Sequence, residues 1–97
     1  MKIVKAAQAG TVESSDIVVK IEPREEGVEI ELTSSVQQQY GTQIENVIRE
    51  TLKELGVMSA RVVAVDKGAL DCTVKARTQA AVFRAAESTD YPWKTEA

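Results

Sequence analysis

The sequence contains no histidine and a single cysteine, Cys72, among its 97 residues. Histidine is the commonest general base at neutral pH and the commonest transition-metal ligand, so its absence narrows the catalytic chemistry open to the chain. A lone cysteine excludes an intramolecular disulfide and a thiolate metal cluster. Both absences argue against an enzyme and against a zinc site.

The sequence also lacks long hydrophobic runs and an excess of basic residues. No apolar stretch approaches the roughly 20 residues that cross a bilayer, and the first residues do not resemble a signal peptide. We therefore expect a cytoplasmic protein that does not engage a membrane. Twelve basic and fifteen acidic residues give a net charge of -3, which argues against nucleic-acid binding because phosphate neutralisation needs a basic surface.

What remains is the composition of a small globular protein, with 43% hydrophobic and 28% charged residues. Aromatic residues make up only 4%, so the core must be built from Val, Ile, Leu and Ala. A chain of this length encloses one core. We expect one domain over residues 1–88 and a polar tail over residues 89–97.

The first third of the chain predicts strands separated by polar turns. Residues 1–12 indicate a strand that ends near Gly10, and residues 17–21 are β-branched and typical of a strand. The polar residues 13–16 between them predict an exposed hairpin loop, wider than a two-residue turn. Residues 28–32 alternate apolar and charged side chains after a turn at residues 23–27, and we expect them to form a hairpin with residues 17–21.

A long amphipathic helix is the clearest predicted element. Ser34 or Ser35 can cap its first turn with Gln37 or Gln38 three residues on, and Gly56 suits its C-terminal cap. Gly41 within it should cost about 1 kcal/mol relative to Ala. The apolar stripe at spacings of three and four comprises Val36, Tyr40, Ile44, Val47, Ile48, Thr51, Leu52 and Leu55.

The last third predicts a second hairpin and a short helix. Residues 61–65 indicate a strand, residues 66–68 a turn, and residues 70–76 alternate as a second strand would. A short helix is expected from about Thr78 to Glu87. The predicted fold class is therefore α+β, with a mainly antiparallel sheet built from two hairpins, one long amphipathic helix packed on a face and a short C-terminal helix.

Several residues carry possible chemistry, but each has a structural interpretation. Cys72 alternates in phase with Leu70 and Val74, which predicts burial rather than reactivity. The carboxylates Glu25, Glu26, Glu29 and Glu31 are typical of a solvated turn and strand face. The basic residues Lys67, Lys75, Arg77 and Arg84 could form a patch for a phosphorylated ligand. The segment Tyr91-Pro92-Trp93 could fold back onto the domain or anchor a partner.

Ser14 stands out through the residues around it. The run Gly10-Thr11-Val12-Glu13-Ser14-Ser15-Asp16 resembles the modification segment of the citrate lyase acyl carrier protein family, in which the pattern is Gly-Thr-x-Glu-Ser-x-Asp. The run Asp66-Lys67-Gly68-Ala69-Leu70-Asp71-Cys72 resembles a second signature of that family. Further similarities lie in Met1-Lys2-Ile3, Arg77 and Pro92-Trp93.

The resemblance implies a carrier subunit without catalytic residues of its own. Ser14 would be joined through a phosphodiester to 2'-(5''-phosphoribosyl)-3'-dephospho-CoA, whose thiol carries the acetyl or citryl group. The implied partners are the alpha subunit (acyl transferase), the beta subunit (citryl lyase), a prosthetic-group transferase and an acetate-dependent activating ligase. Together the subunits would cleave citrate to acetate and oxaloacetate.

Alternatives remain open on the residues alone. The chain could be the carrier subunit of a malonate decarboxylase, which uses the same type of arm. It could instead be a non-covalent adaptor that binds through hairpin edges and Trp93, or a small enzyme. Ser15 adjoins Ser14, and chemistry alone does not choose between the two hydroxyls.

Overall fold

The computed structural model describes residues 1–34 and 37–86 and has the predicted α+β class. A four-stranded, mainly antiparallel sheet is accompanied by a long helix and a shorter C-terminal one. Neither helix in the described residues is long and apolar enough to span a membrane. The elements in chain order are β1 (Ala7–Gly10), β2 (Ile17–Glu22), β3 (Gly27–Ser34), α1 (Gln37–Glu54), β4 (Ser59–Asp66) and α2 (Asp71–Ala85).

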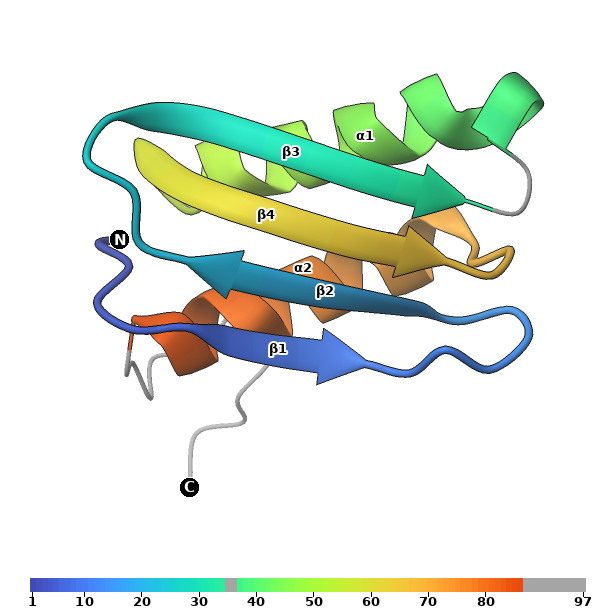
Figure 1. Cartoon of the computed structure of the whole chain (residues 1–97), viewed down its shortest axis with the longest axis horizontal. Helices are drawn as coiled ribbons and strands as arrows, with labels where there is room; N and C mark the ends of the chain where they lie inside the picture. The colour runs from blue at the N-terminus through green and yellow to red at the C-terminus, as the bar shows by residue number, and fades with distance from the viewer. Residues whose placement is uncertain (35–36, 87–97) are drawn as a thin grey trace.

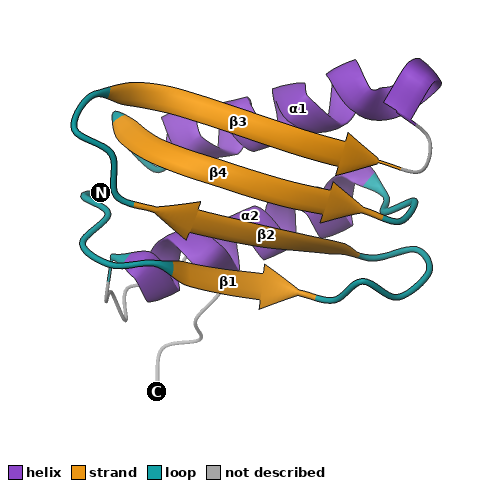
Figure 2. Cartoon of the chain, in the orientation of Figure 1, coloured by secondary structure: helices purple, strands orange, loops and turns teal. Residues whose placement is uncertain are grey.

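The sheet has the strand order β1-β2-β4-β3. The pairs β1/β2 and β2/β4 are antiparallel, whereas β3 and β4 run parallel. Both helices lie on one face of the sheet, and the other face is open (Figure 1, Figure 2). The β1–β2 loop and the β4–α2 turn meet at the same end of the molecule.

The predicted hairpin between residues 17–21 and 28–32 is wrong, because β4 lies between β2 and β3. Helix α1 links β3 to β4 as a crossover, which is the connection that parallel neighbours require. The alternation of apolar and charged residues in β3 is present, with Val28, Ile30 and Leu32 half-buried. Period 2 specifies which face of a strand is buried and says nothing about its partner.

The second predicted hairpin is also wrong, because residues 71–85 form the helix α2. The short helix expected from Thr78 to Glu87 therefore begins earlier, and Glu87 lies outside the described residues. Val74, Thr78 and Ala81 continue at helical spacing and are buried. Cys72 is exposed in the first turn of the helix, so its predicted burial is wrong as well. A short run of alternating apolar residues fits a strand and the first turn of a helix equally well. Only a longer pattern distinguishes the two structures.

Helix α1 confirms the predicted amphipathic element. Ile44, Ile48 and Leu52 are buried against the sheet, with Thr51 beside them. Gly56 ends the helix with φ +70°, its N–H bonding the Lys53 carbonyl at 3.0 Å. This is the C-terminal capping geometry that glycine allows. The predicted contributions of Ser35, Val36 and the Gln37, Gln38 and Tyr40 side chains lie outside the described residues.

The core lies between the sheet and the helices and is built mainly from Val, Ile, Leu and Ala, as the scarcity of aromatics predicts, with Phe83 of α2 as a buried aromatic residue. The central strands β2 and β4 supply Ile17, Val19, Ile21, Val62 and Ala64, all at most 1% exposed. Because the apolar side chains of β2 are buried in the core, the start of β2 holds the end of the preceding loop in place.

Candidate functional site

The loop that carries Ser14 joins β1 to β2, which confirms the predicted exposed hairpin loop. Its tip is a tight turn in which the Asp16 N–H donates to the Glu13 carbonyl at 3.1 Å. The turn leads into a bulge, because the Ser15 N–H donates to the Lys67 carbonyl at 2.8 Å while the Lys67 N–H donates to the Asp16 carbonyl at 2.9 Å. Ser15 has φ +65°, in the left-handed position that such a bulge usually gives to glycine. Ser14 is thereby left at the exposed tip of the turn.

The Asp16 side chain holds this loop against helix α2. Its carboxylate accepts a bidentate pair of hydrogen bonds from Arg77 on α2, at 3.0 Å from Nε and 2.9 Å from Nη2. It also accepts hydrogen bonds from the Thr11 hydroxyl and the Ile17 N–H, both at 2.7 Å. The Arg77 hydrogen bond first, and the Thr11 hydrogen bond next, hold the pKa of Asp16 well below its ordinary value. Asp16 therefore stays ionised and ties both ends of the loop to α2.

Asp66 builds the turn on which the loop rests. Its side chain is fully buried and accepts hydrogen bonds from the Gly68 N–H at 3.1 Å and the Ala69 N–H at 2.9 Å. The Ser34 hydroxyl donates to it at 2.9 Å, which links the end of β3 to the same turn. The structure thus brings together the two seven-residue signatures, residues 10–16 and 66–72, through the backbone of Lys67.

The start of α2 is unusual at this turn. Leu70 is the N-cap residue, yet its side chain makes no capping hydrogen bond and is 71% exposed. Ser, Thr, Asp and Asn are preferred at this position, and apolar residues there cost about 1 kcal/mol relative to them. Local helix chemistry does not explain a leucine at this place.

Of the four basic candidates, Lys67 and Arg77 both contact Asp16, whereas Lys75 and Arg84 have other partners. Lys75 pairs with Glu54 of α1 at 3.4 Å, and Arg84 donates to the Gln8 carbonyl of β1 at 2.7 Å. Arg77 is committed to Asp16, and the exposed Lys67 belongs to the turn beside the Ser14 loop.

The carboxylate candidates are spread over the open face and its turn. Glu29 and Glu31 pair with Arg61 at 2.9 and 3.3 Å, and Glu22 joins them at 3.1 Å. Glu25 and Glu26 are exposed in the turn after β2.

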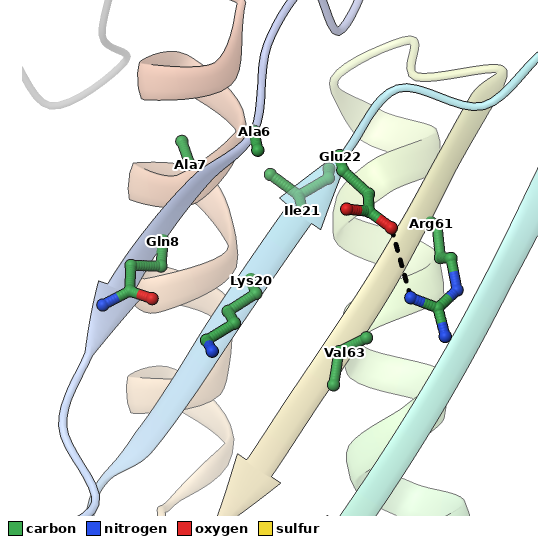
Figure 3. A pocket seen from close by; sticks show the side chains of 8 residues that line it. All are labelled: Ala6, Ala7, Gln8, Lys20, Ile21, Glu22, Arg61 and Val63. Carbon is green, nitrogen blue, oxygen red and sulfur yellow. Dashed lines mark hydrogen bonds and ion pairs between the residues drawn. The ribbon is translucent and has the colours of Figure 1, made fainter.

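A surface pocket of about 500 Å³ lies on this open face. Figure 3 shows Lys20 and the ion pair between Glu22 and Arg61 along it, with apolar side chains between them. It follows the far half of β2, away from the strand end that leads to Ser14. Within residues 1–34 and 37–86, no three Cys, Asp or Glu side chains are placed to hold a metal ion.

Tyr91, Pro92 and Trp93 lie outside the described residues, so their predicted role stays a prediction. The supporting roles of Thr11 and Asp66 and the pairing of Asp16 with Arg77 were not anticipated from the sequence. The signal available was that all four residues fall in or just after the two signatures.

Gly10 offers a test of how tightly the loop is closed at its other end. It has φ +99°, and a Cβ built on it would overlap the carbonyl oxygen of Ile17. We expect Gly10→Ala to destabilise the fold by more than the ~1 to 3 kcal/mol of left-handed backbone strain alone. Gly68→Ala is the matched control, since Gly68 has φ +94° but open space around its Cβ position. Urea unfolding of both variants measures the difference, and equal losses would contradict the close contact.

Comparison with known proteins identifies the kind of scaffold. Residues 4–85 match the model of the ACP family, described as the malonate decarboxylase delta subunit (MdcD). A crystal structure of a Thermus thermophilus protein shares the fold, with a TM-score of 0.55 and 21% identity over 90% of this chain. The chain corresponds to only 16% of that longer protein, so the likeness concerns the fold alone.

Curated relatives match nearly end to end. The citrate lyase acyl carrier protein of Streptococcus mutans is 57% identical, covering 97% of this chain and 93% of the relative. Those of Escherichia fergusonii and Lacticaseibacillus casei are 57% and 52% identical, covering 96% and 97% of this chain and 97% and 93% of the relatives. These relatives are all acyl carrier proteins, and a rigid scaffold with an exposed serine loop suits that class. The chain belongs to the family of citrate lyase acyl carrier proteins.

Proposed function

We propose that this chain is the acyl carrier subunit of a citrate lyase complex and that Ser14 carries its prosthetic group. The group is 2'-(5''-phosphoribosyl)-3'-dephospho-CoA, joined through a phosphodiester and bearing acetyl or citryl as a thioester on its thiol. One observation carries the proposal: Ser14 is exposed at the tip of a turn whose base is fixed by Asp16, Lys67 and Arg77.

The local geometry favours Ser14 over Ser15. The N–H of Ser15 is committed to the bulge, and its left-handed backbone serves to turn the chain toward β2. Ser14 lies between Glu13 and that bulge, and the hydrogen bonds that form the turn and the bulge use no backbone group of Ser14. An enzyme approaching the tip therefore meets the Ser14 hydroxyl with the fewest backbone constraints on its position.

Attachment places the chemistry mostly outside this chain. The serine oxygen forms a new bond to a phosphorus of an activated donor, the donor's leaving group departs with the old bond's electrons, and a base takes the hydroxyl proton. Asp16 is a poor base for this step, because its pKa is lowered by Arg77. The attaching enzyme, a prosthetic-group transferase, supplies the base.

A carrier of this kind needs a firm anchor more than a pocket. The arm supplies the thiol, and the alpha and beta subunits supply acyl transfer and citryl cleavage. An acetate-dependent ligase would recharge the thiol. Tethering raises the effective concentration of the thioester at each active site to roughly the millimolar range, so weak docking is sufficient. In this proposal residues 1–88 form the carrier domain, and residues 89–97 are an appended tail.

Intact-mass measurement of the protein from its own host tests the proposal. The expected result is a mass excess equal to the phosphoribosyl dephospho-CoA group, with the adduct on the peptide that contains Ser14. An unmodified chain within an active citrate-cleaving complex would overturn it. Protein made in a host without the transferase should be unmodified, and adding transferase and donor should restore the mass excess.

The description of the matching family favours a second candidate, the carrier subunit of a malonate decarboxylase. The same anchor would serve there. The complex purified with this chain separates the two, since one cleaves citrate and the other decarboxylates malonate.

A further inference from the structure

Two large apolar side chains lie exposed on the segments that frame Ser14. Val12, in the loop, is 62% exposed, and Leu70, at the end of the neighbouring turn, is 71% exposed. Neither belongs to the hydrophobic core. The two segments are joined by the hydrogen bonds between Lys67 and the residues after Ser14, so both side chains belong to one end of the molecule.

Leucine is an unfavourable N-cap residue for helix α2. The Leu70 carbonyl already accepts from the N–H groups of Thr73 and Val74, at 2.9 and 3.0 Å, but its side chain leaves the N-terminal N–H groups without a cap. A polar side chain would satisfy one of them and would remove an apolar surface from water. A residue that is unfavourable for its own helix and for its own solvation indicates a use outside the fold.

We propose that Val12 and Leu70 form the contact surface for the enzyme that attaches the prosthetic group to Ser14. The inference rests on the proposed attachment at Ser14 and adds the recognition site. Exposed polar residues adjoin both side chains along the chain: Glu13 follows Val12, Asp71 follows Leu70, and Lys67 lies in the same turn as Leu70. Exposed apolar anchors beside polar residues are typical of a protein–protein interface.

The attaching enzyme fits this surface better than the lyase subunits do. The active site of this enzyme must bring the donor phosphorus to the Ser14 oxygen itself. The enzyme therefore covers the tip of the turn and the protein surface on either side of it. After attachment the reacting thiol lies at the far end of a long arm. The lyase subunits can therefore act on the thioester without contacting the base of the loop.

The test compares Leu70→Ser and Val12→Ser with Met58→Ser. Met58 is a matched control, because it is 81% exposed but precedes β4 at the opposite end of the sheet from Ser14. The assay is steady-state attachment by the transferase with its donor, varying the carrier concentration. We expect KM for the carrier to rise roughly tenfold in the Leu70 and Val12 variants with kcat nearly unchanged, as for loss of an interface anchor. Met58→Ser should match the wild type.

Two further measurements separate recognition from folding and from later docking. The thermal midpoint of Leu70→Ser should equal or exceed that of the wild type, because serine can cap α2. Leu70→Ala, which cannot cap, should show the same rise in KM. Each variant, once fully loaded by prolonged incubation, should transfer acyl groups at the wild-type rate.

An unchanged KM in both variants, or an equal rise in Met58→Ser, would overturn the inference while leaving attachment at Ser14 intact. Slower acyl transfer by the loaded variants with normal attachment would assign the surface to a lyase subunit and also overturn it. A wild-type chain that the transferase leaves unmodified would overturn the proposed function and this inference together.

Discussion

Replacing Ser14 with alanine should abolish attachment of the prosthetic group and leave the fold unchanged. The side chain is exposed and makes no hydrogen bond in the described structure, so stability should change by less than about 0.5 kcal/mol. Intact mass after incubation with transferase and donor measures attachment, and circular dichroism with a thermal melt measures the fold. We expect no adduct on this variant, because the backbone of the neighbouring Ser15 is held in the bulge, so that its hydroxyl does not take the place of the Ser14 hydroxyl.

Ser15→Gly is the sharp control for that experiment. It removes the neighbouring hydroxyl and places glycine at the left-handed position of the bulge, where φ is +65°. The left-handed conformation costs a non-glycine residue roughly 1 to 2 kcal/mol, partly offset by the greater chain entropy of glycine. Ser15→Gly should therefore load fully and fold at least as well as the wild type. An adduct on Ser14→Ala that disappears in Ser15→Gly would reassign the attachment to Ser15.

Asp16→Asn is expected to have the largest effect on the shape of the loop. The change removes the charge that Arg77 pairs with and puts an amide donor against a guanidinium donor. Asp16 is only 14% exposed in its side chain, so solvent compensates poorly. Loss of charge-assisted hydrogen bonds of this kind costs about 2 kcal/mol. Urea unfolding at neutral pH measures the loss, and slower attachment at Ser14 should accompany it.

The pH dependence of the unfolding free energy tests whether the charge of Asp16 causes the loss of stability in Asp16→Asn. The pKa of Asp16 is lowered in the folded state, so its stabilising contribution is fully present above the unfolded value of about 3.9 and is lost as pH falls below it. The gap in unfolding free energy between wild type and Asp16→Asn should be constant from pH 5 to 7 and narrow on acidification below about pH 4. A gap that persists unchanged to pH 2 would contradict the ion pair as its source.

A surface ion pair provides the comparison. Glu45 and Arg49 lie one helical turn apart on α1 at 3.2 Å, and both side chains are well exposed. Glu45→Gln should cost no more than about 0.5 kcal/mol. Equal losses in Glu45→Gln and Asp16→Asn would mean that the Asp16 network adds nothing beyond an ordinary surface pair.

Sequence patterns predicted the class of the fold and the helix α1 because long periodicities are read over many residues. The stripe from Ile44 to Leu52 has helical spacing over several turns, and Gly56 marks its end. Short patterns failed. The alternation around Cys72 covers too few residues to distinguish a strand from the first turn of a helix, and its exposure follows from that error.

Strand pairing failed for a different reason. Residues 17–22 and 28–32 are adjacent along the chain, yet β4 pairs with both strands. Partner choice depends on the α1 crossover, which period 2 does not encode. The Ser14 loop was predicted from the polar residues between two strands, and its importance came from the family resemblance. The tie between Asp16 and Arg77 spans 61 positions, so no local pattern could have predicted it.

The ion pair between Asp16 and Arg77 also makes the conformation of the Ser14 loop depend on the order in which the chain is synthesised and folds. The loop that holds Ser14 is made near the start of the chain, but its supports at Lys67 and Arg77 are synthesised much later. The serine therefore reaches its presented shape only after the sheet has closed and α2 has docked. A chain that ends before α2 lacks Arg77 and therefore lacks this support for the loop.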